Sequence, residues 1–209
     1  MVRGFGKSTA RVEMRNFMPI KAGSGGTGDY AEYLLKEEAL KKSAEYYVEG
    51  ETKATTSVYV GSKSAKLGLS GEIDLENAKE LLAGILPDGT QIRGDKTTGQ
   101  EILAHDNTFS APKSLSIQAA EDMRLFDCHV ESVLETLTAL EKYCCVQRVQ
   151  KNGVRSHEKG DGFVGWMTHH WQSREGDIGM HTHVVTMNGC MGEDGVWRAI
   201  EDHVMRDAH

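Results

Sequence analysis

Long apolar segments are missing from this chain of 209 residues, and no run of 18 apolar residues occurs in it. We therefore expect no transmembrane helix and no insertion into membranes. The first residues, Met1 to Lys7, also lack the apolar stretch that a secretory signal requires. Proline is scarce, at three residues, while 39% of the residues are hydrophobic. This composition predicts an ordered, globular, cytoplasmic protein that is long enough to bury one core.

Two common kinds of site are also missing. The four cysteines include the adjacent pair Cys144 and Cys145 but no CxxC spacing, which argues against a cysteine zinc site and favours reduced thiols. The glycine-rich stretch from Ala22 to Gly28 lacks the pattern GxxxxGK[ST]. A nucleotide-binding P-loop is therefore excluded, and we expect this stretch to be a flexible turn before a helix.

An excess of positive charge, which phosphate binding favours, is absent, because the formal net charge is −7. The charge is nevertheless uneven along the chain. Residues 1–28 contain one acidic residue, Glu13, against five basic ones, which are Arg3, Lys7, Arg11, Arg15 and Lys21. A basic arm on an acidic body is compatible with a DNA partner.

The periodicity predicts strands and helices in a mixed order. We expect helices over 30–45 with Asp29 as N-cap, over 75–84 with Asp74 as N-cap, from 113 onward, and over 123–145 with one apolar stripe. We expect strands over 11–18, 57–60, 106–111 and 145–150, the last followed by a turn at Asn152-Gly153, and over two histidine-bearing segments near 163–170 and 181–187. The predicted class is α+β, with an antiparallel sheet of about five strands and helices on both faces.

Three histidines carry the clearest chemical signal. His181 and His183 are two residues apart in a β-branched, alternating segment, so their side chains share one face of a strand. His170 ends the neighbouring predicted strand, eleven residues upstream. If the two strands pair antiparallel, the three imidazoles surround one point. Three protein ligands with open positions are typical of a catalytic rather than a structural metal site.

Longer motifs resemble one family. They are Asp106-Asn-Thr-Phe-Ser-Ala-Pro-Lys-Ser114, His170-Trp-Gln-Ser-Arg174, and His181-Thr-His183 followed by Gly-x-Trp-Arg198. Together, from about Gly28 to Asp207, they resemble the conjugative relaxase domain of the MobF (TrwC/TraI) type, among the HUH endonucleases. The resemblance implies a palm with the tyrosines on a helix and a metal at the centre of the sheet. It also implies nicking and rejoining of one DNA strand at an origin of transfer, through a 5′-phosphotyrosine.

The resemblance assigns roles to individual residues. It implies that His170, His181 and His183 bind a divalent ion, for which Mg, Mn and Zn all suit the site. Asp106 matches the acidic residue beside the site. We expect it to orient a ligand histidine, and acceptance of the tyrosine proton, alone or in addition, stays open. Lys113 and Arg174 also lie in matching motifs. Each of them either contacts a DNA phosphate or stabilises the sheet, and the sequence does not choose between these roles.

The nucleophile follows from the tyrosines near the N-terminus. A tyrosine has an ordinary pKa of about 10 and needs help to attack at neutral pH. The resemblance implies two pairs of tyrosines, whereas this chain has Tyr30 alone at the first position, with Tyr33 one helical turn away, and Tyr46-Tyr47 at the second. We expect Tyr30 to attack first and Tyr46, with Tyr47 as the other candidate of its pair, to be the second nucleophile; whether two tyrosines are used stays open.

Other functions remain open. A rolling-circle replication initiator or transposase would use the same parts at another origin, and a non-catalytic module would bind hairpin DNA without forming an adduct. A metal-dependent hydrolase would explain the histidines but not the motif at 106–114 or the tyrosines. The remaining histidines, including His105, His129 and His169, are expected to be surface or packing residues, with His169 on the opposite face of its strand from His170.

The resemblance also bears on partners and domain organisation. Single-stranded or hairpin DNA at an origin of transfer is the expected partner, together with relaxosome accessory proteins and a coupling protein, and we expect a monomer. We expect residues 1–28 to form a basic N-terminal strand and glycine-rich loop, and residues 29–209 to form a relaxase palm cut short at its C-terminus. We treat 1–209 as one domain, and we expect weaker DNA binding than in an extended homologue.

Overall fold

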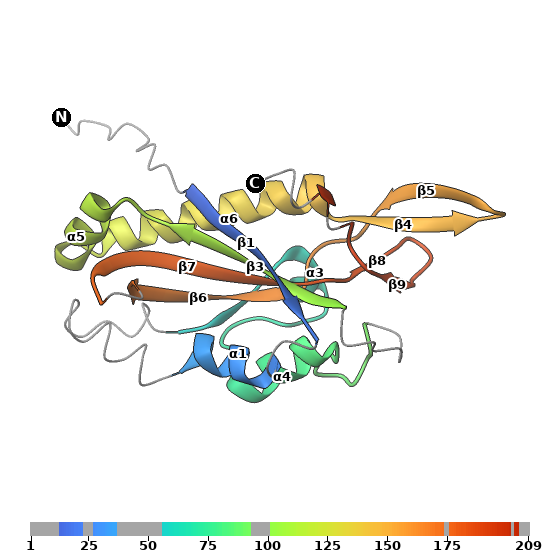
Figure 1. The fold of residues 1–209 in the computed structure, drawn as a ribbon, viewed down its shortest axis with the longest axis horizontal. Coiled ribbons are helices and arrows are strands. Elements are labelled where there is room, and N and C mark those ends of the chain that lie inside the picture. Colours follow the sequence, from blue (N-terminus) through green and yellow to red (C-terminus); the bar gives the residue numbers. More distant parts are fainter. Residues whose placement is uncertain are drawn as a thin grey trace.

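A five-stranded antiparallel sheet forms the centre of the molecule in the computed structural model, which describes residues 13–22, 27–36, 56–92, 101–173, 176–201 and 203–204. The strand order is β1-β3-β7-β6-β2 (Figure 1). The bounds are β1 Glu13–Lys21, β2 Val58–Val60, β3 Ile102–Ser110, β6 Gly165–Gln172 and β7 Ile178–Met187. Every neighbouring pair is antiparallel, so the α+β class and the expected strand number are confirmed.

Helices cover both faces of this sheet, as predicted (Figure 1). Helices α1 (Thr27–Leu35) and α4 (Leu75–Ala83) lie on one face, and α5 (Lys113–Glu121) and α6 (Arg124–Cys144) lie on the other. A short helix, α3 (Ser62–Lys66), follows β2. Strand alternation sends odd and even residues of β7 to opposite faces. Val185 accordingly packs in the cluster that contains Leu34 and Leu81, whereas Val184 packs with Val133 and Leu137.

Local sequence signals account for several element ends. The side chain of Asp74 accepts a hydrogen bond from the backbone N–H of Asn77 and caps α4, which ends at Gly84 in the left-handed conformation. Helix α6 buries most of the predicted stripe, including Phe126 and Val133. Leu134, expected in the same stripe, is 39% exposed, because it lies about 100° around the helix from Val133.

Three predicted boundaries near the N-terminus were wrong. Helix α1 begins at Thr27, so Asp29 lies in its first turn instead of capping it, and the helix ends at Leu35. Strand β1 runs on to Lys21 instead of stopping at Met18. The rest of the helix expected over 30–45 lies outside the described residues.

Strand β3 is longer than its sequence motif, because it begins at Ile102 and not at Asp106. Its residues pair with β1 on one side and with β7 on the other. Pairing on both sides extends the strand back through Ile102, Leu103 and Ala104, a stretch too short to show alternation on its own. His105, expected to precede the strand, is therefore buried within it and stacks on Phe17 with ring centroids 4.8 Å apart.

Two small hairpins lie outside the main sheet. Strands β4 (Val146–Lys151) and β5 (Val154–Lys159) pair through a turn in which Asn152 and Gly153 have positive φ, as the Asn-Gly signal predicts. This hairpin projects away from the body of the molecule (Figure 1). Strands β8 (Cys190–Met191) and β9 (Trp197–Arg198) form the second hairpin. Among the helices that the structure describes, none is long and apolar enough to span a bilayer.

Candidate metal centre and nucleophile

Antiparallel pairing of β6 and β7 gathers the three predicted histidines. His170 lies directly opposite His181 in the register, and His183 follows on the same face two residues later. Their ring centroids are 5.0 to 5.3 Å apart. The nitrogen atoms that they offer to an ion lie within 4.8 Å of one another. The expectation that this pairing surrounds one point with three imidazoles is confirmed.

Hydrogen bonds orient two of these rings for a metal. His183 donates from Nδ1 to Asp106 Oδ2 at 2.8 Å, and its buried Nε2 has no partner among the described residues. His181 donates from Nδ1 to the carbonyl of Gly179 at 2.8 Å. Since a neutral imidazole that donates from Nδ1 keeps its lone pair on Nε2, both rings present a free ligand atom. The residues present therefore fit a divalent metal ion.

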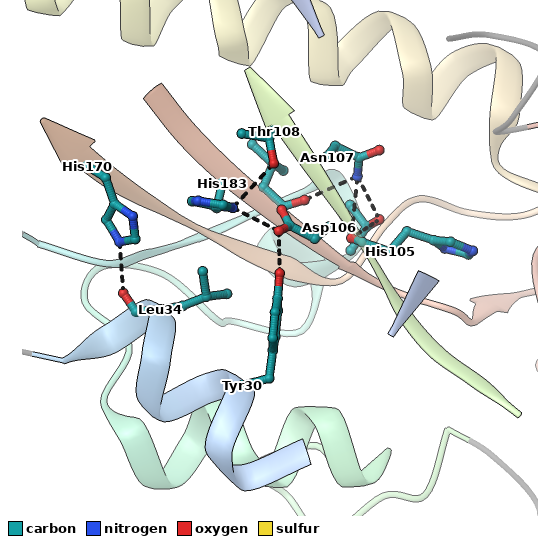
Figure 2. A network of polar contacts seen from close by, with 10 residues as sticks. Tyr30, Leu34, His105, Asp106, Asn107, Thr108, His170 and His183 are labelled. Atoms are coloured by element: carbon teal, nitrogen blue, oxygen red, sulfur yellow. Dashed lines mark hydrogen bonds and ion pairs between the residues drawn. The ribbon is translucent and has the colours of Figure 1, made fainter. Parts of the chain in front are cut away.

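His170 is held from the other side of the site. Its Nε2 donates to the carbonyl of Leu34 at 3.2 Å, which leaves the lone pair on Nδ1. Leu34 lies in the last turn of α1, where carbonyls have no partner within the helix. The contact therefore satisfies a helix-end carbonyl and joins α1 to the histidine centre (Figure 2).

Burial keeps His170 and His181 neutral, as metal ligation requires. Burial, together with the neighbouring rings of His183 and His181, lowers the pKa of His170 to about 3. Burial also lowers the pKa of His181.

The carboxylate of Asp106 joins this centre to a tyrosine. Tyr30 projects from α1 toward the sheet, and its hydroxyl donates to Asp106 Oδ2, the same oxygen that accepts from His183 (Figure 2). Asp106 is 1% exposed, and it lies at the middle of β3, between β1 and β7. One buried carboxylate oxygen therefore contacts both a candidate nucleophile and a candidate metal ligand.

A cavity of about 780 Å³ opens beside these groups and is lined by Tyr30, Asp106 and the three histidines together with Tyr33 and Lys113. On its wall, Lys113 Nζ forms an ion pair with Asp177 Oδ2 at 2.8 Å, and the two side chains are 61% and 66% exposed. The Lys113 ammonium lowers the pKa of the Asp177 carboxyl. The cavity therefore has a cation at its rim and the three imidazoles inside.

Three of the predicted site residues, Tyr46, Tyr47 and Arg174, lie outside the described residues. The others, Tyr30, Asp106, Lys113 and the three histidines, all line the same cavity. His169 points to the opposite face from His170, as expected, and hydrogen-bonds Thr182 there.

Sequence reasoning missed three contributors to the site. The carbonyls of Leu34 and Gly179 act through the backbone, so their side-chain types carry no signal. Asp177 lies between the histidine strands, in a segment whose motif we matched only at Arg174. Asp177 is 64 positions from Lys113 in the sequence. Opposite charges so far apart can be matched only after the pairing of the strands between them is known.

The fold and the site together define a class of protein in which an aspartate joins a helix-borne tyrosine to a three-histidine centre that fits a metal ion. The model of one family, the TrwC relaxase, matches residues 27–209. The chain therefore belongs to the TrwC relaxase family.

Individual relatives agree with this assignment. The multifunctional conjugation protein TraI of Escherichia coli is 31% identical over 190 residues, which are 90% of this chain and 10% of that protein. TraI of Escherichia coli strain K12 is 31% identical over 180 residues, or 85% of this chain and 10% of that protein. The chain thus spans about a tenth of the length of these curated relatives.

Solved structures extend the similarity to the fold. A copper-bound conjugative relaxase TrwC in complex with oriT DNA has a TM-score of 0.72 and 30% identity, and the match covers 92% of this chain and 64% of that one. A metal-free TrwC complex with oriT DNA has a TM-score of 0.70 at 30% identity, covering 92% of this chain and 62% of that one.

Proposed function

We propose that this chain nicks and rejoins one strand of DNA at an origin of transfer, as the relaxase domain of a conjugation protein. The observation that carries the proposal is the sharing of Asp106 Oδ2 between the Tyr30 hydroxyl and His183 Nδ1. It joins a nucleophile, a proton acceptor and a metal ligand within one cavity. Membership of the TrwC relaxase family supports this reaction over hydrolysis of a small molecule.

Tyr30 is the first nucleophile in this proposal. Its oxygen attacks the scissile phosphorus, its proton passes to Asp106 Oδ2, and the bond from phosphorus to the 3′ oxygen breaks. The products are a 5′-phosphotyrosine and a free 3′-hydroxyl end, which receives a proton from solvent. Rejoining is the reverse attack of a 3′-hydroxyl on the phosphotyrosine, so the energy of the bond is conserved. Tyr46 or Tyr47 supplies the second nucleophile.

His170, His181 and His183 hold the divalent ion in this proposal. When bound, the ion polarises the phosphate oxygens and stabilises the charge that gathers on them in the transition state. The donors are three nitrogens, and for such a set the affinity order places Zn²⁺ above Mn²⁺, while Mg²⁺ prefers oxygen ligands. The ion used in the cell, Mg, Mn or Zn, then depends on supply as well as on affinity.

Lys113 contacts a phosphate of the bound strand in this proposal. Its ammonium lies at the rim of the cavity that holds Tyr30, and its present partner, Asp177, is an exposed carboxylate. An exposed ion pair contributes little to stability, so a phosphate can replace this carboxylate at small cost. Arg174 is assigned the same kind of contact from its place in the motif.

The β4–β5 hairpin supplies a second DNA contact in this proposal. It projects from the body (Figure 1), and its four basic side chains are exposed, namely Arg148, Lys151, Arg155 and Lys159. This concentration of positive charge stands out in a chain with a net charge of −7. The major groove of a duplex admits a two-stranded β-ribbon. The hairpin therefore fits the duplex stem of a hairpin DNA, while the cavity takes the single strand.

Two alternatives differ in the substrate or in the chemistry. A rolling-circle initiator or transposase would act at its own origin, and the family match favours the origin of transfer over that substrate. A non-catalytic module would bind hairpin DNA and form no adduct, and the Tyr30–Asp106 contact argues against it. A monomer, cytoplasmic location, accessory proteins and a coupling protein remain part of the proposal.

The test is formation of a covalent adduct. Labelled single-stranded oligonucleotides that span candidate origins of transfer are incubated with the protein and Mg²⁺ or Mn²⁺, and the products are separated on a denaturing gel. We expect a shifted band that EDTA and Tyr30→Phe remove. Tyr33→Phe is the matched control, because Tyr33 lies one turn further along the same helix, lines the same cavity and is expected to leave the band.

The outcomes separate the alternatives. A band that persists in Tyr30→Phe and disappears in Tyr46→Phe or Tyr47→Phe moves the first nucleophile to that pair. Adducts on a replication origin and on no transfer origin favour the initiator. Tight hairpin binding without any adduct, with every origin and metal supplied, contradicts the nicking proposal and favours the non-catalytic module.

A further inference from the structure

A buried polar cluster lies on the opposite face of the sheet from the histidine centre. Thr182 Oγ1 hydrogen-bonds His169 Nδ1 at 2.8 Å and His129 Nε2 at 2.9 Å. His129 and Thr182 are 0% exposed and His169 is 4% exposed. The cluster therefore joins β6, β7 and α6 through one hydroxyl.

Its members are neighbours of the ligand histidines in the sequence. Thr182 stands between His181 and His183, and His169 precedes His170. Since side chains alternate along a strand, these residues face α6 while the ligands face α1. Any shift of the cluster along either strand thus moves a ligand histidine by the same amount.

The cluster also marks the strand register. His169 and Thr182 are directly opposite each other, as are His170 and His181. The pairing becomes irregular between His170 and Gln172. Backbone hydrogen bonds beyond His170 therefore do little to fix the register of β6 against β7. A slip of one residue would turn the ligands to the wrong face of the sheet. The hydrogen bond between His169 and Thr182 holds the register next to the last regular pair, which is His170 and His181.

Fold stability does not explain why these groups are polar. The surroundings are apolar and aromatic: Phe126 packs edge-on against His169 with ring centroids 5.0 Å apart, and it also stacks on Trp171. Burying a polar network costs desolvation, and an apolar set of similar shape is often as stable or more so. What such a set cannot supply is a direction-dependent bond that selects one arrangement.

We propose that Thr182, His169 and His129 are positioning residues that hold the ligand histidines in register and orientation from the rear face of the sheet. This proposal rests on the three-histidine metal site of the proposed function. The hydrogen bonds of the cluster lie on the face of the sheet away from the three ligand histidines. The cluster acts through the backbone of β6 and β7, and His129 fixes that backbone to α6.

Binding of Co²⁺ tests the proposal without any DNA, because the absorption bands of this ion report its coordination geometry. Thr182→Val removes the hydroxyl and keeps the shape, whereas Thr182→Ser keeps the hydroxyl. Loss of a direct partner of a ligand weakens metal binding by about 10- to 100-fold, and these residues act one step further away. We therefore expect Thr182→Val to weaken Co²⁺ binding by about 5- to 10-fold and to shift the bands, and Thr182→Ser to restore both.

Thr186→Val is the matched control. Thr186 lies on the same strand and the same face, is 0% exposed, and hydrogen-bonds Asn107 and the carbonyl of His105 away from the ligands. We expect this variant to lose stability in urea much as Thr182→Val does and to bind Co²⁺ as the unmodified protein does. Equal loss of Co²⁺ affinity in the two variants would mean general weakening of the strand and would overturn the proposal.

His129→Leu keeps the test decisive if Thr182→Val does not fold, because it leaves the Thr182–His169 bond in place. A folded His129→Leu protein with weaker Co²⁺ binding and shifted bands supports the proposal. Unchanged affinity and bands in His129→Leu overturn the role of His129, and the same result in Thr182→Val overturns the whole cluster. Absence of Co²⁺ binding in the unmodified protein would contradict the three-histidine metal site of the proposed function. This result differs from failure of the positioning role, in which the unmodified protein binds Co²⁺ and the variants bind it equally well.

Discussion

The hydroxyl of Tyr30 donates a hydrogen bond to Asp106, although the two residues are 76 positions apart in the sequence. The same carboxylate oxygen accepts from His183. A proton can therefore leave the tyrosine along an existing hydrogen bond, into a carboxylate that is also connected to the metal ligands. This relationship underlies the first prediction.

Asp106→Asn should slow formation of the covalent adduct by about 10²- to 10⁴-fold, the usual contribution of a positioned base. The amide keeps the shape of the side chain but accepts a proton poorly. It also weakens the hold on His183 Nδ1, so metal affinity should fall as well. Single-turnover nicking at saturating metal separates the two effects. Adduct formation at the unmodified rate under those conditions would contradict the assignment of Asp106.

Asp177→Asn should tighten binding of single-stranded DNA by about two- to fivefold, because it removes the exposed ion pair with which a DNA phosphate competes for Lys113. The measurement is fluorescence anisotropy at fixed salt. In a Lys113→Gln background the gain should shrink toward none. Asp122→Asn is the control, since Asp122 forms a similar surface pair with Arg124 but does not line the cavity. An equal gain with and without Lys113 would show a general charge effect.

Arg155→Gln should weaken binding of a hairpin DNA and lower the slope of log affinity against log salt by about 0.9, the value for one lost phosphate contact. Arg155 is exposed on the projecting β5 strand. Arg155→Lys keeps the charge and should keep the slope. The comparison uses titrations at several salt concentrations. An unchanged slope in Arg155→Gln would remove this residue from the DNA contact.

Acid should destabilise the fold through His129, whose burial lowers its pKa to about 4. The ordinary histidine pKa is about 6.5, so the unfolded chain binds a proton that the folded chain does not bind between those values. The free energy of unfolding should therefore fall as the pH drops from about 6.5 toward 4, by at most roughly 1.4 kcal/mol per pH unit for this group. Above about pH 6.5 this contribution is constant.

His129→Leu should make that pH dependence shallower, as measured by urea unfolding at pH 7 and pH 5, while the lowered pKa values of His169 and His170 maintain the rest of it. His157→Leu is the control, because His157 is exposed on β5, outside the buried cluster. Equal slopes in the unmodified protein and in His129→Leu would mean that the His129 proton makes no difference.

Much of the fold could be predicted because its signals are local. The helix over 75–84 was marked by Asp74 and Gly84, and the hairpin by Asn152-Gly153, all of which act within four residues. The predicted boundaries were wrong where contacts between segments distant in the sequence set the ends of an element. The extent of β3 depends on its pairing with β1 and β7, and the start of α1 at Thr27 has no capping signal that we could use.

The candidate site divides in the same way. The histidines were found from the i, i+2 spacing and from one assumption, that their strands pair antiparallel. The partners that orient them were not found, because the carbonyls of Leu34 and Gly179 leave no trace in the side chains. The cluster around Thr182 was not found either, since it needs α6 to be placed against the rear face.

The sequence by itself determined the element types, the capped ends, the alternation that puts His181 and His183 on one face, and the motifs that indicate the family. Only the tertiary structure decided that Tyr30 meets Asp106 and that Leu34 meets His170, across 76 and 136 positions. The physical reason is the distance along the sequence over which each interaction acts. Alternation and capping follow from the geometry of a few consecutive residues. The position of α1 follows from the burial of Ala31 and Leu34 against a sheet built from the rest of the chain.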